Sequence, residues 1–315
     1  MPSRHLVDPQ MEPLLAMAAA MDLAAGQESP FMKALLEAPA PTSETVDMRE
    51  VRMPGPKGAP DVRGLLYAPK DAAKPRPAVL HIHGGGYVIG APEMSAEGNL
   101  AYAERFGAVV LSVDYRLAPA AKHPGPVEDC YAALAWLYAQ AEALNLDRAR
   151  IIVSGESAGG GLAAALTLLA RDRGAYPLAF QHLIYPMIDD RTVTHPEPSP
   201  YAGQFVWTRE FNRFGWTSLL DHAPGSPEVS CYAAAARAED VSGLPPAYIA
   251  CGALDLFLEE NLEYARRLMR AGVPVELHVY PGAPHGFQMM AEAKVARQAT
   301  RDSLAALERV LARSG

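Results

Sequence analysis

The chain has 315 residues, which suits one large hydrophobic core with an appended segment better than two equal domains. Its formal net charge of −8 argues against nucleic acid and anionic membranes as partners, because phosphate groups attract basic surfaces and no basic stripe is visible. No apolar run approaches the roughly 20 residues that a membrane-spanning helix needs.

Residues 1–45 are rich in Met, Ala and Leu and predict helices ahead of the core. Residues 14–21 resemble the apolar centre of a secretory signal, yet Asp8 and Glu12 precede them and Asp22 follows. We therefore interpret this run as a helix, with a secretory signal as the alternative.

The cysteines are scattered and odd in number, whereas disulfide frameworks use cysteines in pairs. We expect a reducing compartment, the cytoplasm, in which the thiols act as small buried hydrophobic groups. A reactive thiol is the alternative. The residues concerned are Cys130, Cys231 and Cys251.

Residues 46–53 and 62–67 predict two antiparallel edge strands around the turn Pro54-Gly55-Pro56. From residue 79 onward, strands and helices alternate. We expect strands at 79–83, 108–114, 151–154 and 178–185, and helices at 97–106, 127–143 and 158–171. Such alternation builds parallel βαβ units, so the sequence predicts an α/β fold with a mostly parallel central sheet flanked by helices.

The pattern breaks between residues 190 and 245, a region rich in Pro and aromatic residues. We expect residues 190–230 to form a cap insertion that covers the core together with residues 1–45; ordinary surface packing is the alternative. The core then comprises residues 46–189 and 231–315, the latter with strands at 247–252 and 275–280 and helices at 258–271 and 291–313. The aromatic residues of the insertion are Phe205, Trp207, Phe211, Phe214 and Trp216.

Residues 155–159 read Gly-Glu-Ser-Ala-Gly and stand between a predicted strand and a predicted helix. In a nucleophile elbow the turn is so tight that a Cβ on either flanking residue would strike the backbone, and the serine hydroxyl is exposed above the sheet. The context identifies Ser157 as a nucleophile. Taken alone, the pentapeptide also fits a Gly-Ser loop that caps an ordinary helix.

A serine hydroxyl needs a base and an orienting acid to become a good nucleophile. Asp255 follows the predicted strand at 247–252, and His285 lies in a Gly- and Pro-rich loop after the strand at 275–280. Loops at the carboxyl ends of parallel strands assemble sites. The chain order Ser157, Asp255, His285 is that of α/β hydrolases and differs from the orders in chymotrypsin and subtilisin.

The predicted strand at 79–83 ends in three consecutive glycines. Without side chains, consecutive backbone N–H groups can approach a developing alkoxide, and each such donor typically lowers the barrier by about 3 kcal/mol. We expect the N–H groups of Gly85, Gly86 and Ala158 to form an oxyanion hole.

Taken together, these motifs resemble the hormone-sensitive lipase family of carboxylesterases, as found in bacteria, over nearly the whole chain. The resemblance implies an α/β-hydrolase fold with a helical cap and a triad of Ser157, Asp255 and His285. Two positions depart from the family pattern: Glu156 replaces the usual Asp or Thr, and residues 256–260 replace the common Pro-Leu-x-Asp-Glu. The matching segments are residues 83–87, 113–119, 155–160 and 285–287, together with Asp255.

Other patterns in the sequence are weaker evidence for a functional site. His81 and His83 on one strand could chelate a metal, but no neighbouring Cys, Asp or Glu cluster completes a site, so we predict no metal. Residues 159–164 match the dinucleotide pattern G-x-G-x-x-A but begin inside a helix; we expect close helix–sheet packing there and no cofactor. We interpret Glu156 as a solvated or cap-bonded carboxylate without a catalytic role, and Arg116 as a tether for loops near the site.

We predict a hydrolase of carboxylic esters with short to medium acyl chains, because a closed apolar cap limits the length of the acyl group. A non-catalytic small-ligand receptor on the same fold is an alternative, although the related receptors have lost the histidine that His285 supplies here. An amidase or thioesterase is another, because the acyl-transfer chemistry is shared. We expect Tyr87, Phe205 and Trp207 to line the substrate pocket. The sequence is also compatible with a homodimer.

Overall fold

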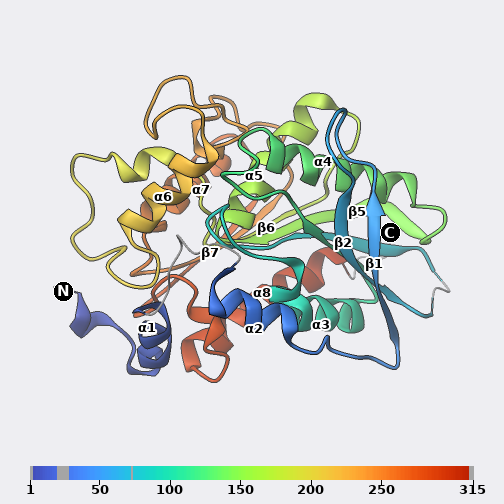
Figure 1. Cartoon of the computed structure of the whole chain (residues 1–315), viewed down its shortest axis with the longest axis horizontal. Coiled ribbons are helices and arrows are strands. Elements are labelled where there is room, and N and C mark those ends of the chain that lie inside the picture. Colours follow the sequence, from blue (N-terminus) through green and yellow to red (C-terminus); the bar gives the residue numbers. More distant parts are fainter. Residues whose placement is uncertain (1–2, 20–27, 72–73, 312–315) are drawn as a thin grey trace.

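A single eight-stranded sheet runs through the centre of the protein in this computed structural model, which describes residues 3–19, 28–71 and 74–311 (Figure 1). The strand order is β1-β2-β4-β3-β5-β6-β7-β8. The β1–β2 and β2–β4 pairs are antiparallel, and all other pairs are parallel. The prediction of an α/β fold with a mostly parallel sheet is therefore confirmed.

The strands differ from the predictions mainly at their ends and at one edge. Strand β2 pairs with both β1 and β4, so the expectation that it is an edge strand is wrong. Alternation of polar and apolar residues reports which face of a strand is buried and says nothing of its hydrogen-bonded neighbours. The strands are β1 (Val46–Met53), β2 (Val62–Pro69), β3 (Arg76–Ile82), β4 (Val109–Asp114), β5 (Leu146–Glu156), β6 (Gln181–Ile184), β7 (Ala247–Gly252) and β8 (Val275–Tyr280).

The helices begin and end where local chemistry favours it. Gly107 and Gly174 follow α3 and α5 with φ of 60° and 68°, a left-handed geometry that glycine adopts without strain. The side chain of Thr208 accepts a hydrogen bond from the Phe211 N–H at the start of α6. The α-helices are α1 (Glu12–Ala19), α2 (Pro30–Glu37), α3 (Ala96–Phe106), α4 (Gly125–Ala139), α5 (Ala158–Arg173), α6 (Arg209–Leu219), α7 (Leu258–Arg270) and α8 (Lys294–Leu311).

The predicted helical region at residues 1–45 is helical only in part. Short 3₁₀ turns at Arg4–Leu6 and Pro9–Met11 precede α1, whereas residues 38–45 contain no helix, because Pro39 and Pro41 cannot continue one. Residues 20–27, including Met21 and Asp22, lie outside the described residues, as does the end of the helix predicted at 291–313. Helix α4 ends at Ala139, four residues before the predicted end.

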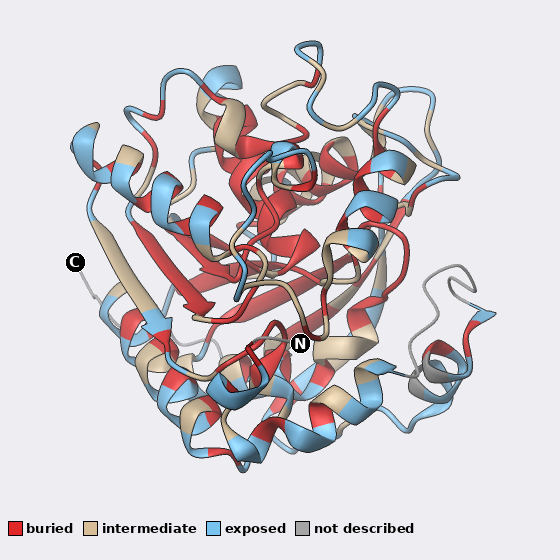
Figure 2. Ribbon diagram, turned by 90° about the vertical axis from the view of Figure 1, so that its left-hand side faces the viewer, coloured by how far each residue is buried: buried red, intermediate tan, exposed pale blue. Residues whose placement is uncertain are grey.

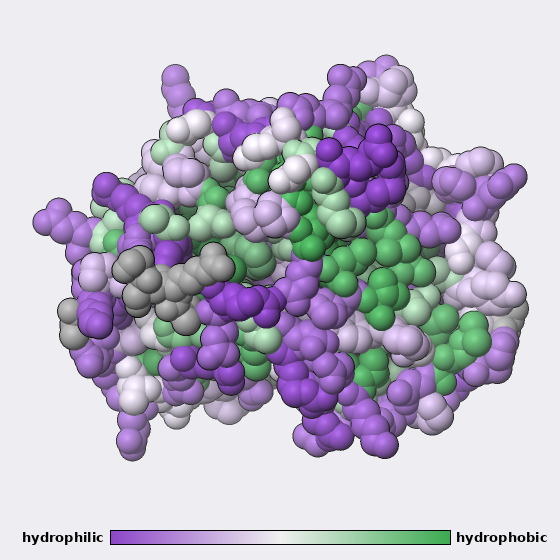
Figure 3. Space-filling view, turned by 180° about the vertical axis from the view of Figure 1, so that it is seen from behind, coloured by the Kyte–Doolittle hydropathy of each residue, from purple (hydrophilic) through white to green (hydrophobic). Residues whose placement is uncertain are grey.

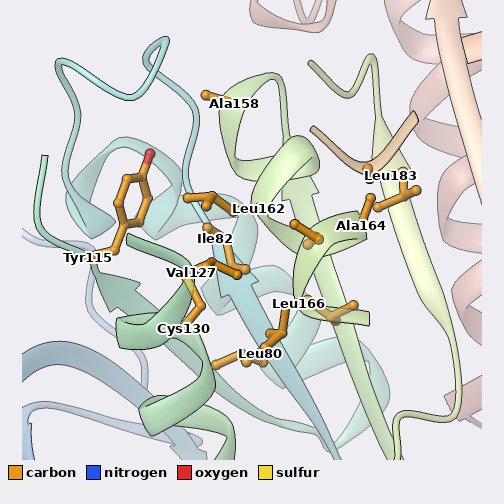
Figure 4. Close-up of a cluster of buried hydrophobic side chains, with 14 of the residues drawn as sticks. Leu80, Ile82, Tyr115, Val127, Cys130, Ala158, Leu162, Ala164, Leu166 and Leu183 are labelled. Atoms are coloured by element: carbon orange, nitrogen blue, oxygen red, sulfur yellow. The ribbon is translucent and has the colours of Figure 1, made fainter. Parts of the chain in front are cut away.

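Helices cover both faces of the sheet. Helices α4 and α5 lie above it in Figure 1, and α3 and α8 lie below it. Leu80 and Ile82 of β3 join the hydrophobic cluster on one face, and Val79, directly before them, joins the cluster on the other, as the two-residue period of a strand requires. Figure 4 shows Leu80, Ile82 and Leu162 packed between β3 and α5. Buried strands fill the interior in Figure 2, while the helices expose their outer faces.

Helix α5 runs through the centre of the molecule, with residues 158–170 all buried. It starts directly after Ser157 at the carboxyl end of β5, so the core itself holds the predicted nucleophile in place. Within the parts of the chain that the structure describes, no helix is both long and apolar enough to cross a membrane.

Candidate active site

Ser157 lies on a sharp turn between β5 and α5, with φ of 55° and ψ of −121°. A Cβ added to Gly155 would lie 2.4 Å from the Gly159 carbonyl oxygen, and one added to Gly159 would lie 2.0 Å from the Ile82 carbonyl oxygen. The Ser157 N–H donates to the Ile184 carbonyl at 2.9 Å. Neighbouring backbone therefore holds the positive φ, which costs about 1–3 kcal/mol in a non-glycine residue.

Three side chains from distant parts of the sequence form one chain of hydrogen bonds. His285 Nε2 lies 2.9 Å from Ser157 Oγ, and His285 Nδ1 lies 2.8 Å from Asp255 Oδ2. An ionised carboxylate can only accept, so Nδ1 carries the proton of the neutral imidazole and Nε2 is free to accept from the serine hydroxyl. This is the arrangement that activates a serine as a nucleophile.

Asp255 is completely buried in the loop after β7. Its second oxygen, Oδ1, accepts a hydrogen bond from the Phe257 N–H at 2.9 Å. One carboxylate oxygen is thus held by the backbone while the other faces His285, which fixes the orientation of the imidazole.

Aromatic rings surround His285. The ring centroids of Tyr185, Phe257 and Trp207 lie 4.7, 5.1 and 6.0 Å from that of the imidazole. Ser157 and His285 are only 7% and 6% exposed. The low polarity around the three hydrogen-bonded side chains strengthens the electrostatic interactions between them.

Two of these rings, those of Tyr185 and Phe257, were not predicted from the sequence. Tyr185 follows β6 at its carboxyl end, and Phe257 stands two residues after Asp255. Their positions next to strand ends were a usable signal, since such positions face the site in a parallel sheet.

The glycine loop after β3 packs against the nucleophile turn. A Cβ added to Gly84 would lie 3.3 Å from the Cβ of Ser157, and one added to Gly85 would lie 2.0 Å from the Ile89 carbonyl oxygen. Gly85 and Gly86 have φ of 119° and 60°, which other residues rarely adopt. Ala158 begins α5, where the first N–H groups have no acceptor within the helix. The structure thus places the loop with Gly85 and Gly86 beside the turn that presents the Ala158 N–H.

The three residues expected to line the pocket have different surroundings. Trp207 lies over the site: its Cη2 would be 2.2 Å from a Cβ on Gly86, and its Nε1 donates to Asn212 Oδ1 at 3.2 Å. Tyr87 is completely buried and donates from its hydroxyl to the Met187 carbonyl at 2.9 Å, so it braces the backbone. Phe205 is 6% exposed and belongs to the same hydrophobic cluster as Tyr185.

Glu156 has a partner that the sequence did not predict. Its carboxylate oxygens lie 3.0 and 3.1 Å from His81 Nε2. Burial raises the pKa of Glu156, but the interactions with the His81, His182 and His83 imidazoles together outweigh this, and the net direction is downward. Glu156 is therefore a partly exposed anion that is hydrogen-bonded to His81 rather than to a helix cap.

The His81 and His83 side chains do not converge on a metal. His83 Nδ1 lies 2.8 Å from the Gly84 carbonyl oxygen, its ring stacks on Tyr115 at 4.4 Å, and burial lowers its pKa to about 4. Within the described ranges, no group of three or more His, Cys, Asp or Glu residues has a geometry that could hold a metal ion.

Other predictions concern packing near the site. Arg116 Nε and one of its terminal nitrogens donate to the two oxygens of buried Asp129, at 2.8 and 2.7 Å, which ties the loop after β4 to α4. A Cβ on Gly161 would lie 2.0 Å from the Met187 carbonyl oxygen, in keeping with close packing by the glycines of α5. Cys130 and Cys251 are buried, Cys231 is partly buried, and all three thiols are free.

Comparison with known proteins places this site in a family. Residues 79–289 match a family model described as the alpha/beta hydrolase fold. Carboxylesterase NlhH of Mycobacterium tuberculosis is 36% identical over 278 residues, which cover 83% of this chain and 82% of that protein. Esterase LipI of the same species is 36% identical over 241 residues, covering 75% of this chain and 73% of the relative.

A solved structure gives the same result in three dimensions. A bacterial heroin esterase superimposes with a TM-score of 0.90 and 39% sequence identity, covering 98% of this chain and 99% of that one. The matched family model includes the glycine loop, the Ser157 turn, Asp255 and His285. The chain belongs to the hormone-sensitive lipase family of α/β hydrolases and is a carboxylic-ester hydrolase.

Proposed function

We propose that Ser157, His285 and Asp255 are the catalytic triad of this esterase. The observation that supports it is the continuous chain of hydrogen bonds, 2.9 and 2.8 Å long, from the serine hydroxyl through the imidazole to a buried carboxylate. Ser157 Oγ attacks the carbonyl carbon of the ester while its proton passes to His285 Nε2. Asp255 stabilises the imidazolium that forms.

The first tetrahedral intermediate collapses when the bond from carbon to the alcohol oxygen breaks. His285 gives its proton to the departing alcohol, which leaves an acyl group on Ser157. Water then attacks this acyl-enzyme, with His285 again taking the proton, and the carboxylic acid is released.

The backbone N–H groups of Gly85, Gly86 and Ala158 stabilise the oxyanion in both steps. Two features support this assignment: the glycine loop packs against Ser157, and the N–H of Ala158 begins a helix. The helix N-terminus adds a favourable partial positive charge.

Residues 1–45 and 190–230 form a cap over the core, and the core consists of residues 46–189 and 231–315. Contacts between the two cap segments support this division: Ser3 Oγ donates to Gln204 Oε1 at 2.9 Å. The Asp8 N–H donates to the Gly282 carbonyl at 3.0 Å, three residues before His285. Trp207 of the second segment lies against Gly86. A roof this close to the nucleophile favours short to medium acyl groups and suits small-molecule esters.

The free thiols of all three cysteines support a cytoplasmic location.

Strand β8 is an edge strand of the sheet, at the opposite end from β1, and its Val279 is 39% exposed. Hydrophobic side chains also gather in patches on the molecular surface shown in Figure 3. An edge strand offers unpaired backbone groups to a second copy, and we propose on this ground that the protein forms a homodimer through β8. Light scattering on the wild type and on Val279→Lys tests this: a monomeric wild type contradicts it.

Covalent labelling tests the triad. Diethyl p-nitrophenyl phosphate should phosphorylate Ser157 as an oxygen–phosphorus bond forms, p-nitrophenolate leaves and the hydroxyl proton passes to His285. Mass spectrometry should locate the adduct on the peptide that contains Ser157, with loss of ester hydrolysis in the same proportion. Labelling of another serine, or inactivation without an adduct, would refute the assignment. Anilide and thioester substrates, run in parallel, distinguish the esterase from an amidase or thioesterase.

A further inference from the structure

The ends of strands β3 and β5 are joined by a side-chain hydrogen bond between His81 and Glu156. The two strands are adjacent and parallel, with His81 opposite Ser154 and Ile82 opposite Gly155. Glu156 is the last residue of β5 and directly precedes Ser157. His81 lies three residues before the glycine loop. The bond therefore connects the segment that carries the nucleophile to the segment that carries the oxyanion hole.

The donor and acceptor roles follow from the partners. The Glu156 oxygens, 3.0 and 3.1 Å from His81 Nε2, can only accept from it when the carboxylate is ionised, so Nε2 carries a proton. On the other side, His81 Nδ1 lies 2.9 Å from Ser112 Oγ and 3.2 Å from Asn99 Nδ2. These groups, from β4 and α3, hold the ring so that Nε2 points at Glu156. His81 is 1% exposed, so this orientation is enforced by packing.

The charged and titratable groups that face Glu156 are histidines and tyrosines. They are His81 of β3, His83 just after β3, His182 of β6, Tyr102 of α3, Tyr115 just after β4 and Tyr185 just after β6. Among the described residues, no arginine or lysine forms an ion pair with this carboxylate. His81 is thus the only hydrogen-bond partner seen for the Glu156 side chain in the described structure, and the position of the carboxylate depends on it.

Small movements of Glu156 should alter the positions of the reacting groups around Ser157. A Cβ on Gly84 would lie 3.1 Å from the Glu156 carbonyl oxygen and 3.3 Å from the Ser157 Cβ, so the glycine loop packs against the backbone just before the serine and against the serine side chain itself. A misplacement of about 1 Å between reacting groups costs on the order of 100-fold in rate.

We propose that Glu156 and His81 are positioning residues: their hydrogen bond sets the distance between Ser157 Oγ and the N–H groups of Gly85 and Gly86. The proposal rests on the triad and oxyanion hole assigned above. It requires the length of the Glu156 side chain and an acceptor oxygen at its end. The negative charge itself is dispensable.

Three substitutions separate length from charge. Glu156→Ala removes the acceptor and should lower kcat about 100-fold with KM nearly unchanged, because oxyanion contacts form mainly in the transition state. Glu156→Gln keeps the length and an acceptor oxygen and should restore most of the lost kcat. Glu156→Asp keeps the charge but is one methylene too short, and should remain as impaired as the alanine variant. Glu259→Asp, the same change at an exposed position of α7, is the matched control.

Rates are expressed per active site, titrated by complete reaction with diethyl p-nitrophenyl phosphate, so that misfolded protein does not count. A trifluoromethyl ketone, which forms a tetrahedral adduct with the serine, should bind the Ala and Asp variants about 100-fold more weakly and the Gln variant nearly normally.

Active Asp with inactive Gln would show that charge acts and would overturn the proposal. Equal activity in all three variants, or equal loss in all three, would also overturn it. Failure of wild-type titration at Ser157 would instead disprove the triad, and this outcome is separate from the ranking of the Glu156 variants.

Discussion

His285 Nε2 lies 2.9 Å from Ser157 Oγ, although 128 residues separate the two along the chain. The contact exists because β5 and β8 belong to the parallel part of the sheet, so their carboxyl ends lie on the same side, and the loop after β8 turns back toward the end of β5. The loop is anchored where the Gly282 carbonyl accepts from the Asp8 N–H and where three aromatic rings enclose the imidazole. The base is therefore oriented before any substrate arrives, which reduces the entropy cost of reaction.

Ser157→Ala should abolish ester hydrolysis, with a loss on the order of 10⁴-fold or more, because no other group on the hydrogen-bonded chain can attack the carbonyl carbon. The strained φ of the turn is held by backbone contacts, so the free energy of unfolding should change little. Initial rates with p-nitrophenyl acetate and urea unfolding midpoints measure the two effects. Turnover close to that of the wild type would exclude Ser157 as the nucleophile.

Asp255→Asn should lower kcat on the order of 10⁴-fold, because an amide can hold His285 in the wrong tautomer and cannot stabilise the imidazolium. Glu259→Gln is the matched control, since Glu259 is nearby on α7 but exposed. It should keep activity within about threefold. Steady-state kinetics of both variants decide the question: the reverse ranking would assign the acid to Glu259.

Gly86→Ala should reduce kcat by roughly 10²- to 10³-fold, the typical cost of losing one oxyanion donor. The new Cβ would lie 2.2 Å from Trp207 Cη2, so the loop or the indole must move. Gly107→Ala is a close control, because Gly107 has the same φ of 60° and nothing within 4 Å of the added Cβ. It should lower stability without changing kcat. Equal kinetic effects in the two variants would show that backbone strain alone is responsible.

His182 should make the protein sensitive to acid. It is buried between Ser154 Oγ and Ser303 Oγ, at 2.9 and 2.8 Å, and burial lowers its pKa to about 4. The ordinary pKa in an unfolded chain is about 6.5, so only the unfolded chain takes up this proton between these two values. The stabilisation by neutral His182 is therefore complete above about pH 6.5 and is lost as the pH falls to about 4.

Replacement of His182 by glutamine should remove this pH-dependent contribution to the free energy of unfolding. In His182→Gln, the slope of the unfolding free energy against pH over that window should be smaller by up to about 1.4 kcal/mol per pH unit. Urea unfolding at a series of pH values measures it, with the same change at exposed His195 as the control. Parallel slopes in the wild type and the His182 variant would contradict the prediction.

Esters with short acyl chains should be better substrates than long ones, because the cap closes over the nucleophile. Each added CH₂ should favour binding by about 0.8 kcal/mol until the pocket is full, and kcat/KM should fall beyond about eight carbons. Trp207→Ala should shift this limit to longer chains, whereas Phe214→Ala, on the exposed side of α6, should not. A series of p-nitrophenyl esters from acetyl to palmitoyl measures the limit. A steady rise to palmitoyl would show an open groove.

Local features of this protein can be predicted from the order of its residues. Strand–turn–helix around Ser157 follows from an apolar run, two glycines and an alanine-rich segment, because a tight turn and a buried helix are determined within a dozen residues. The positions of Asp255 and His285 after successive strands follow in the same way. Alternation of strands and helices also predicts the mostly parallel sheet, since parallel strands need long crossovers.

The partners of individual side chains were decided only by the tertiary structure. The bond from His81 to Glu156, the rings of Tyr185 and Phe257 on His285, and the indole of Trp207 over Gly86 all join separate elements. Periodicity reports which face of an element is buried, but the neighbour that this face meets depends on strand order and loop path. Strand β2 shows the same limit, because its residues are alike whether one edge or both are paired. Contacts of this kind arise when the whole chain packs at once, and no short segment encodes them.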